Sequence, residues 1–133
     1  MSRLLRTYWP SILVVLVILY ATWVPRPIDY DSIPPIPYID KLFHAIMFGG
    51  LAGALMFDYF RAAPKERKLS LRVVVLVCCS SAAFGIFDEM VQGWLDIGRN
   101  SDVADIFADC VGVLAAAFIA PPVVRAIFRK NVH

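Results

Sequence analysis

Four long apolar runs, separated by short polar or proline-rich segments, set the pattern of the chain. The first extends from Tyr8 to Val24, and the others cover residues 40–60, 69–95 and 102–128. A helix needs about 20 mostly apolar residues to span a membrane. The pattern therefore predicts an all-α membrane protein, with one domain over residues 1–133 and four transmembrane helices in a compact antiparallel bundle.

The segments between the runs are of three kinds. Residues 25–37 hold five prolines, which cannot continue a helix, so this connector is expected to be extended. Residues 61–68 are mainly basic, and residues 96–101 form a short polar turn. A cleaved signal peptide is the alternative reading of the first run. The run is long for that role, and Trp23 stands where cleavage needs a small residue, so a retained helix is favoured.

Composition supports the membrane assignment. Of the 133 residues, 59% are hydrophobic and only 18% are charged. Soluble domains are nearer half apolar and a quarter charged, so a soluble enzyme or a nucleic-acid-binding module is not expected. Cys78, Cys79 and Cys110 lie in apolar runs, where free thiols behave as small hydrophobic groups.

Charge predicts the orientation, because basic residues near span ends stay in the cytoplasm. Ten of the thirteen basic residues fall at the two termini and around the second connector, which four spans place on one side. Nine of the eleven acidic residues fall on the other side. We therefore expect both termini in the cytoplasm, an acidic outer face, and an integral membrane protein surrounded by lipid.

Polar side chains recur at helical spacing near the outer ends of the spans. In the second run His44 shares a face with Asp40 and Lys41, and in the third Gln92 shares a face with Glu89. The fourth run carries acids at three positions, of which Asp102 suits a helix cap. Together these predict an outward polar pocket with a floor of Glu89, Gln92, Asp105 and Asp109 and a rim of Asp40, Lys41, His44, Arg99 and Asp102.

Asp109 carries most of the argument for the pocket, because it lies two turns inside an apolar helix. An ionisable group there costs about 2.5 to 3.5 kcal/mol unless it faces polar partners. Arg99, Lys41, His44 and Gln92 are the possible partners. An ion-pair cluster that only fixes helix packing remains the alternative to a ligand-binding role.

Small residues at every fourth position predict close helix packing. They form Ala45-x-x-x-Gly49-x-x-x-Gly53 in the second run, Ser81-x-x-x-Gly85 in the third and Ala108-x-x-x-Gly112 in the fourth. Gly112 lies on the same face as Asp109, so the polar stripe should point into the bundle.

Three motifs, in this order along the chain, resemble the VanZ-like family of small bacterial membrane proteins. They are Asp40-Lys41-x-x-His44, Glu89-x-x-Gln92 and Arg99-x-x-Asp102-x-x-Asp105-x-x-x-Asp109-x-x-Gly112. The resemblance covers about residues 40–116. It implies a four-helix membrane protein linked to resistance to the glycopeptide teicoplanin, but it supplies no reaction. Asp109 departs from the family pattern, in which Asn is usual, and adds negative charge to the pocket.

Three classes of function stay open. The first is binding or modulation of a cell-envelope component, such as a lipid-linked cell-wall precursor. The second is an intramembrane enzyme with His44, Glu89 and Asp109 as acid–base candidates, although no convincing nucleophile is present. The third is a small transporter or channel subunit. We expect no cofactor. A metal site using His44 with two or three carboxylates is chemically allowed, but a lone histidine among scattered acids is too weak a signal to predict one.

Overall fold

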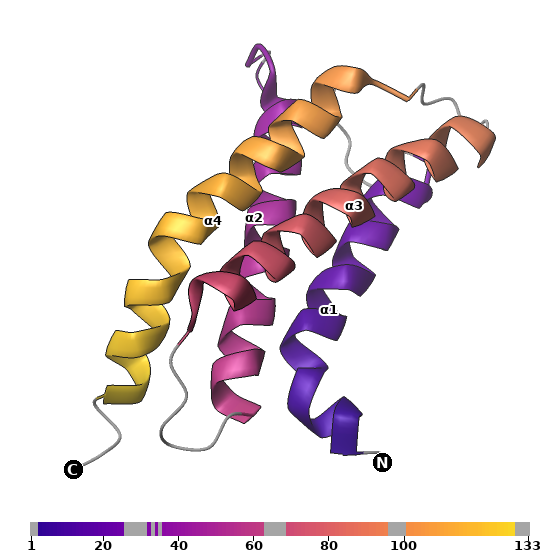
Figure 1. Cartoon of the computed structure of the whole chain (residues 1–133). Helices are drawn as coiled ribbons and strands as arrows, with labels where there is room; N and C mark the ends of the chain where they lie inside the picture. Colours follow the sequence, from indigo (N-terminus) through magenta and orange to yellow (C-terminus); the bar gives the residue numbers. More distant parts are fainter. Residues whose placement is uncertain are drawn as a thin grey trace.

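The computed structural model describes residues 3–25, 32, 34, 36–62, 69–95 and 101–129, and these residues contain four α-helices (Figure 1). Each helix is long and apolar enough to cross a membrane, which confirms the prediction of an all-helical protein with four candidate spans. The helices are α1 (Arg3–Trp23), α2 (Ile39–Ala62), α3 (Leu71–Leu95) and α4 (Val103–Arg129).

Local chemistry explains where two of the helices begin. The carboxylate of Asp102 accepts a hydrogen bond of 2.8 Å from the backbone N–H of Ala104, so Asp102 caps α4 as its sequence position predicts. The hydroxyl of Ser70 accepts a longer bond of 3.4 Å from the N–H of Val73 at the start of α3.

Helix α1 starts ahead of its apolar run and is kinked. It begins at Arg3, contains Pro10 and has non-helical backbone angles at Tyr8. A proline inside a helix removes one backbone hydrogen bond and its ring displaces the preceding turn. The kink therefore leaves backbone groups of the first two turns without partners inside α1.

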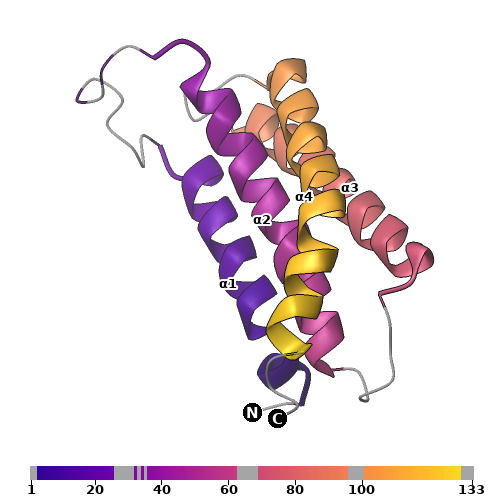
Figure 2. The ribbon, with the colours of Figure 1, turned by 90° about the vertical axis from the view of Figure 1, so that its left-hand side faces the viewer.

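Helix α2 occupies the centre of the fold. It contacts α1, α3 and α4, whereas α1 and α4 make no contact with each other within the described residues. Figure 2 shows α1 and α4 on different sides of α2. The arrangement is therefore not a four-cornered ring of helices, and α2 presents side chains to each of the other three helices.

Helices α2 and α4 run side by side and approach each other closely enough for their backbones to touch. A Cβ placed on Gly49 would lie 2.8 Å from the carbonyl oxygen of Gly112, and one placed on Gly112 would overlap the carbonyl oxygen of Ala45. The small residues of the two sequence stripes thus meet backbone to backbone, as predicted. This contact brings the first turns of α2 and α4 together.

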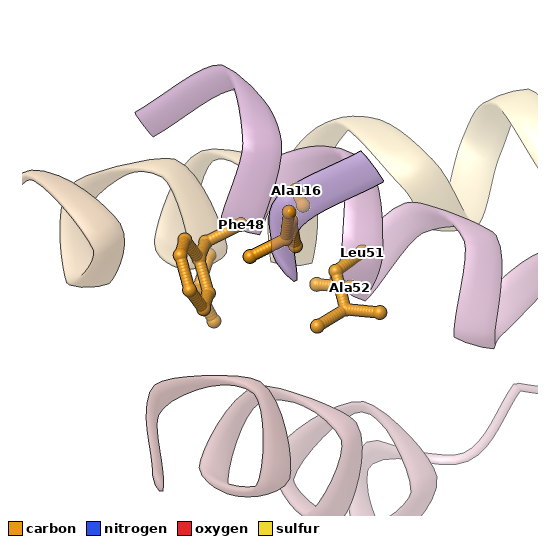
Figure 3. Close-up of a cluster of buried hydrophobic side chains, with 6 residues drawn as sticks. Phe48, Leu51, Ala52 and Ala116 are labelled. Atoms are coloured by element: carbon orange, nitrogen blue, oxygen red, sulfur yellow. The ribbon is translucent and has the colours of Figure 1, made fainter. Parts of the chain in front are cut away.

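An apolar core fills the middle of the bundle. Its buried members come from α1, α2 and α4, and the ring of Phe48 packs 5.9 Å from that of Phe84 of α3. Figure 3 shows Phe48, Leu51 and Ala52 of α2 beside Ala116 of α4. A second core around Met56, Leu69 and Val124 lies toward the end where α4 finishes.

Candidate functional site

All but one of the buried acids among the described residues gather at the end of the bundle where α1 and α3 finish and α2 and α4 begin (Figure 1). Ion pairs and hydrogen bonds connect these side chains to one another and to the neighbouring helices. We call them the polar cluster, and its members are Asp40, Lys41, His44, Asp88, Glu89, Gln92, Asp102, Asp105 and Asp109.

Lys41 forms the outer part of the polar cluster. Its ammonium group lies 2.6 Å from carboxylate oxygens of Asp102 and Asp105 and 3.0 Å from Asp40. The hydrogen bond from Lys41 holds the pKa of Asp102 below its ordinary value, so this pair stays ionised at neutral pH. With three carboxylates around it, Lys41 has no N–H left to hold an anionic ligand.

His44 occupies the interior of the polar cluster, although the sequence placed it on the rim. It is only 6% exposed. Its Nδ1 lies 3.0 Å from Oδ1 of Asp109, and its Nε2 lies 3.8 Å from Oδ2 of Asp105. The Nδ1–H donates to Asp109, which fixes the ring and leaves Nε2 directed toward the remaining carboxylates.

Glu89 connects α3 to the start of α4. One carboxylate oxygen accepts a 3.0 Å hydrogen bond from the backbone N–H of Asp102, and the other accepts a 3.2 Å bond from the amide of Gln92. Glu89 is 1% exposed. Since Asp102 is the cap of α4, Glu89 positions the first turn of that helix against α3.

Asp88 links α3 to α1. Its Oδ1 accepts hydrogen bonds from the hydroxyl of Thr22 at 2.9 Å and the indole N–H of Trp23 at 2.8 Å. Its Oδ2 accepts a 3.0 Å bond from the Gln92 amide, so Gln92 bridges Asp88 and Glu89. The sequence analysis considered Trp23 only as a residue too large for signal-peptide cleavage, and the role of Thr22 carried no sequence signal.

Carboxyl groups outnumber basic groups in the polar cluster. Six carboxylates face one lysine and one histidine among the described residues. Arg99, the other cation predicted for the rim, lies outside the described residues. A cluster that served helix packing alone would be expected to match its charges, because an unmatched charge in a membrane is costly.

A groove of about 600 Å³ opens along the side of the α2–α4 pair. Small residues such as Gly50, Gly53 and Ala115 form its lining, and exposed side chains such as Ile46 and Ile119 stand at its edges. Its lining also includes Ala45, which follows His44, and Gly112, which lies one turn after Asp109. The groove therefore extends along the spans to within one helical turn of the polar cluster.

A second polar site lies at the opposite end of the bundle, where α2 finishes. Asp58 is fully buried and accepts hydrogen bonds from both the backbone N–H and the hydroxyl of Ser11, at 3.0 and 2.6 Å. Arg61 pairs with Asp58 at 3.2 Å and donates to the carbonyl of Thr7. These contacts satisfy backbone groups that the Pro10 kink releases, so this site has a structural role.

A comparison with protein-family models matches residues 7–128 to VanZ/LLP1. The chain belongs to the VanZ/LLP1 family. The family match and the four apolar helices together make this VanZ/LLP1 protein an integral membrane protein. Comparisons with curated proteins and with solved structures gave no match.

The structure of this VanZ/LLP1 protein joins most of the residues that the sequence singled out. The three motifs meet in one place, and His44 is the partner that Asp109 requires. Asp88, Thr22 and Trp23 extend the cluster beyond the predicted set. The buried role of Asp58 was also missed, although Pro10 within an apolar run was a signal that α1 needed external hydrogen-bond partners.

Proposed function

We propose that this protein binds a lipid-linked component of the bacterial cell envelope. The groove along α2 and α4 holds the hydrocarbon chain of that component, and the polar cluster holds its headgroup. The proposal rests on the continuity between the groove and the polar cluster. Ala45 and Gly112 line the groove, and they lie within one helical turn of His44 and Asp109.

The groove suits a flexible hydrocarbon chain. Its lining is apolar and lacks large side chains at Gly49, Gly50 and Gly53, so the backbone of α2 forms part of the floor. A chain of this kind is buried there against protein on one side and membrane lipid on the other. Such a site favours lipids with long unbranched or repeating chains over compact molecules.

The polar cluster suits a headgroup that donates hydrogen bonds. Its carboxylates supply many acceptors, while the N–H groups of Lys41 and Gln92 are already used within the cluster. Sugar hydroxyls, amides and amines are complementary to such a surface. A lipid-linked cell-wall precursor carries groups of these kinds.

The distribution of charge supports an outward-facing polar cluster. Arg61, Arg125 and Arg129 lie toward the opposite end, where basic residues indicate the cytoplasmic side of the inner membrane. We infer an antiparallel bundle with both termini in the cytoplasm. Binding of an extracytoplasmic precursor would then connect this protein to glycopeptide susceptibility, as its family resemblance implies.

A second candidate function is intramembrane catalysis, which the His44–Asp109 contact favours. Asp109 orients the imidazole so that Nε2 can accept a proton, as a general base requires. If His44 is the base, His44→Ala removes turnover of a lipid-linked substrate while leaving its binding. Wild-type function in the His44→Ala protein would exclude catalysis of this type.

Transport has less support. The described residues between the polar cluster and Asp58 form an apolar core that includes Ile18, Phe48 and Val113. A cation or proton pathway requires polar groups or water through that region.

The groove can be tested by filling it with a larger side chain. A Cβ on Gly50 meets no atom within 4 Å, so Gly50→Leu extends into the groove without disturbing the bundle. We expect at least a tenfold loss of affinity, or about 1.4 kcal/mol, for a synthetic polyprenyl glycoside, which carries sugar hydroxyls and no phosphate. Titration of the detergent-purified protein, followed by native mass spectrometry, measures this loss.

The control is Ala83→Leu, which adds a similar volume at an exposed position of α3 away from the groove. It should bind the polyprenyl probe as the wild type does. Equal binding by the Gly50→Leu and wild-type proteins would contradict the assignment of the groove. Binding of the free sugar as strong as that of the polyprenyl form would contradict it as well.

A further inference from the structure

We infer that His44, Glu89 and Asp105 form a binding site for one divalent transition-metal ion. The three residues belong to α2, α3 and α4, and each can direct one ligand atom so that all three atoms lie within 4.8 Å of one another. This assignment goes beyond lipid binding and does not depend on the groove.

The spacing of the three ligand atoms suits a common ion. Two atoms that each bind a metal at about 2.1 Å are separated by at most about 4.2 Å. The trio therefore needs only small side-chain adjustments to close around an ion. Glu89 is held by Gln92 and by the backbone of Asp102, and Asp105 is held by Lys41, so two of the ligands are already positioned.

His44 is oriented as metal-binding histidines commonly are. In such sites one ring nitrogen binds the ion while the other donates to a carboxylate, which fixes the ring. Here Nδ1 donates to Asp109 at 3.0 Å, and Nε2 is left toward Asp105, whose Oδ2 is 3.8 Å away. That distance is too long for a hydrogen bond and leaves the Nε2 lone pair available for an ion.

A second observation comes from Asp109. This residue is 0% exposed, and its Oδ2 has no hydrogen-bond partner among the described residues. The oxygen lies against Gly85, one helical turn before Glu89 on the same face of α3. A buried carboxylate oxygen without a donor, on the side chain that holds His44, is accounted for by a nearby cation or by the water that such an ion holds.

The ligand set selects the class of metal. One imidazole nitrogen with two carboxylates suits Zn²⁺ or Mn²⁺, whereas Ca²⁺ and Mg²⁺ prefer oxygen ligands alone. An ion would also offset part of the excess of carboxylates in the polar cluster. Three protein ligands leave a coordination position open for water or for an oxygen atom of a bound headgroup.

Metal binding can be measured on the full-length protein in detergent. After chelator treatment, we expect the wild type to bind one equivalent of Zn²⁺ by calorimetry, and Co²⁺ to give visible absorption bands of a bound ion. Glu89→Gln and Asp105→Asn should each weaken Zn²⁺ binding at least tenfold. Asp109→Asn, which acts through His44, should weaken it by about 10- to 100-fold.

The matched control is Asp40→Asn, which removes an acid of the same polar cluster that lies outside the trio. It should bind Zn²⁺ within about twofold of the wild type. Zn²⁺ should also raise the midpoint of thermal unfolding in the wild type and in Asp40→Asn, but not in Glu89→Gln or Asp105→Asn. This second readout separates a lost site from a misfolded variant.

The inference is overturned if the wild type binds no stoichiometric Zn²⁺ or Mn²⁺, or if Asp40→Asn weakens binding as much as the trio variants do. Tighter binding of Ca²⁺ than of Zn²⁺ would also overturn it. None of these outcomes affects the groove, because the Gly50→Leu experiment depends on the hydrocarbon chain of its probe.

Discussion

Replacing Asp58 by alanine is expected to destabilise the protein by about 3 to 5 kcal/mol, because a buried charge partner is removed. The substitution leaves the N–H and hydroxyl of Ser11 without their acceptor and Arg61 without its counterion. It also releases the support that α2 gives to the Pro10 kink of α1. Thermal unfolding of the purified protein in detergent, monitored by circular dichroism, measures the loss.

Asp40→Ala is the matched control, because it also removes one acid from α2. The Asp40 side chain is about half exposed, and Lys41 keeps two other carboxylate partners. We expect a change of about 1 kcal/mol or less. Equal stability of the Asp58→Ala and Asp40→Ala proteins would show that the contacts of Asp58 do not support the fold.

Gly112→Ala is expected to lower the free energy of unfolding by about 1 to 3 kcal/mol, the range for overpacked cores, with a value toward its upper end. The added methyl group meets the backbone carbonyl of Ala45, which cannot rotate away as a side chain could. Helices α2 and α4 must then separate, and the polar cluster opens with them. The loss should appear as a lower unfolding midpoint and as weaker Zn²⁺ binding.

Gly50→Ala isolates the contribution of packing. Both glycines lie inside helices, so both substitutions gain up to about 1 kcal/mol from helix propensity. Only Gly112 faces a backbone obstacle, since a Cβ on Gly50 meets open space. Gly50→Ala should be neutral or stabilising, and a similar loss in both proteins would contradict the close α2–α4 contact.

Much of this architecture follows from local properties of the sequence. The four spans are predictable because a membrane-spanning helix is recognised from the length and apolar composition of its own segment. The convergence of Glu89 and Asp109 is predictable because isolated acids in a membrane must find partners. The close contact at Gly112 follows in the same way from the spacing of small residues.

The remaining features depend on which helices become neighbours, and spacing within one helix does not determine that. The central position of α2 is one example, and it explains why His44 is buried where a rim position was expected. The contact between Asp88 and Thr22 is another, because a threonine near a span end has no distinctive pattern. The partner of Asp58 could not be predicted either, because Ser11 lies 47 positions away along the chain.

The central place of α2 also has a consequence for biogenesis. Helix α4 is synthesised after the other three, and it supplies Asp105 and Asp109 to Lys41 and His44 of α2. Until α4 enters the bilayer, Lys41, His44 and Glu89 lack the partners that α4 and its cap provide. We expect such an intermediate to be retained by the insertion machinery or degraded, so that arrival of the last helix acts as a checkpoint for assembly.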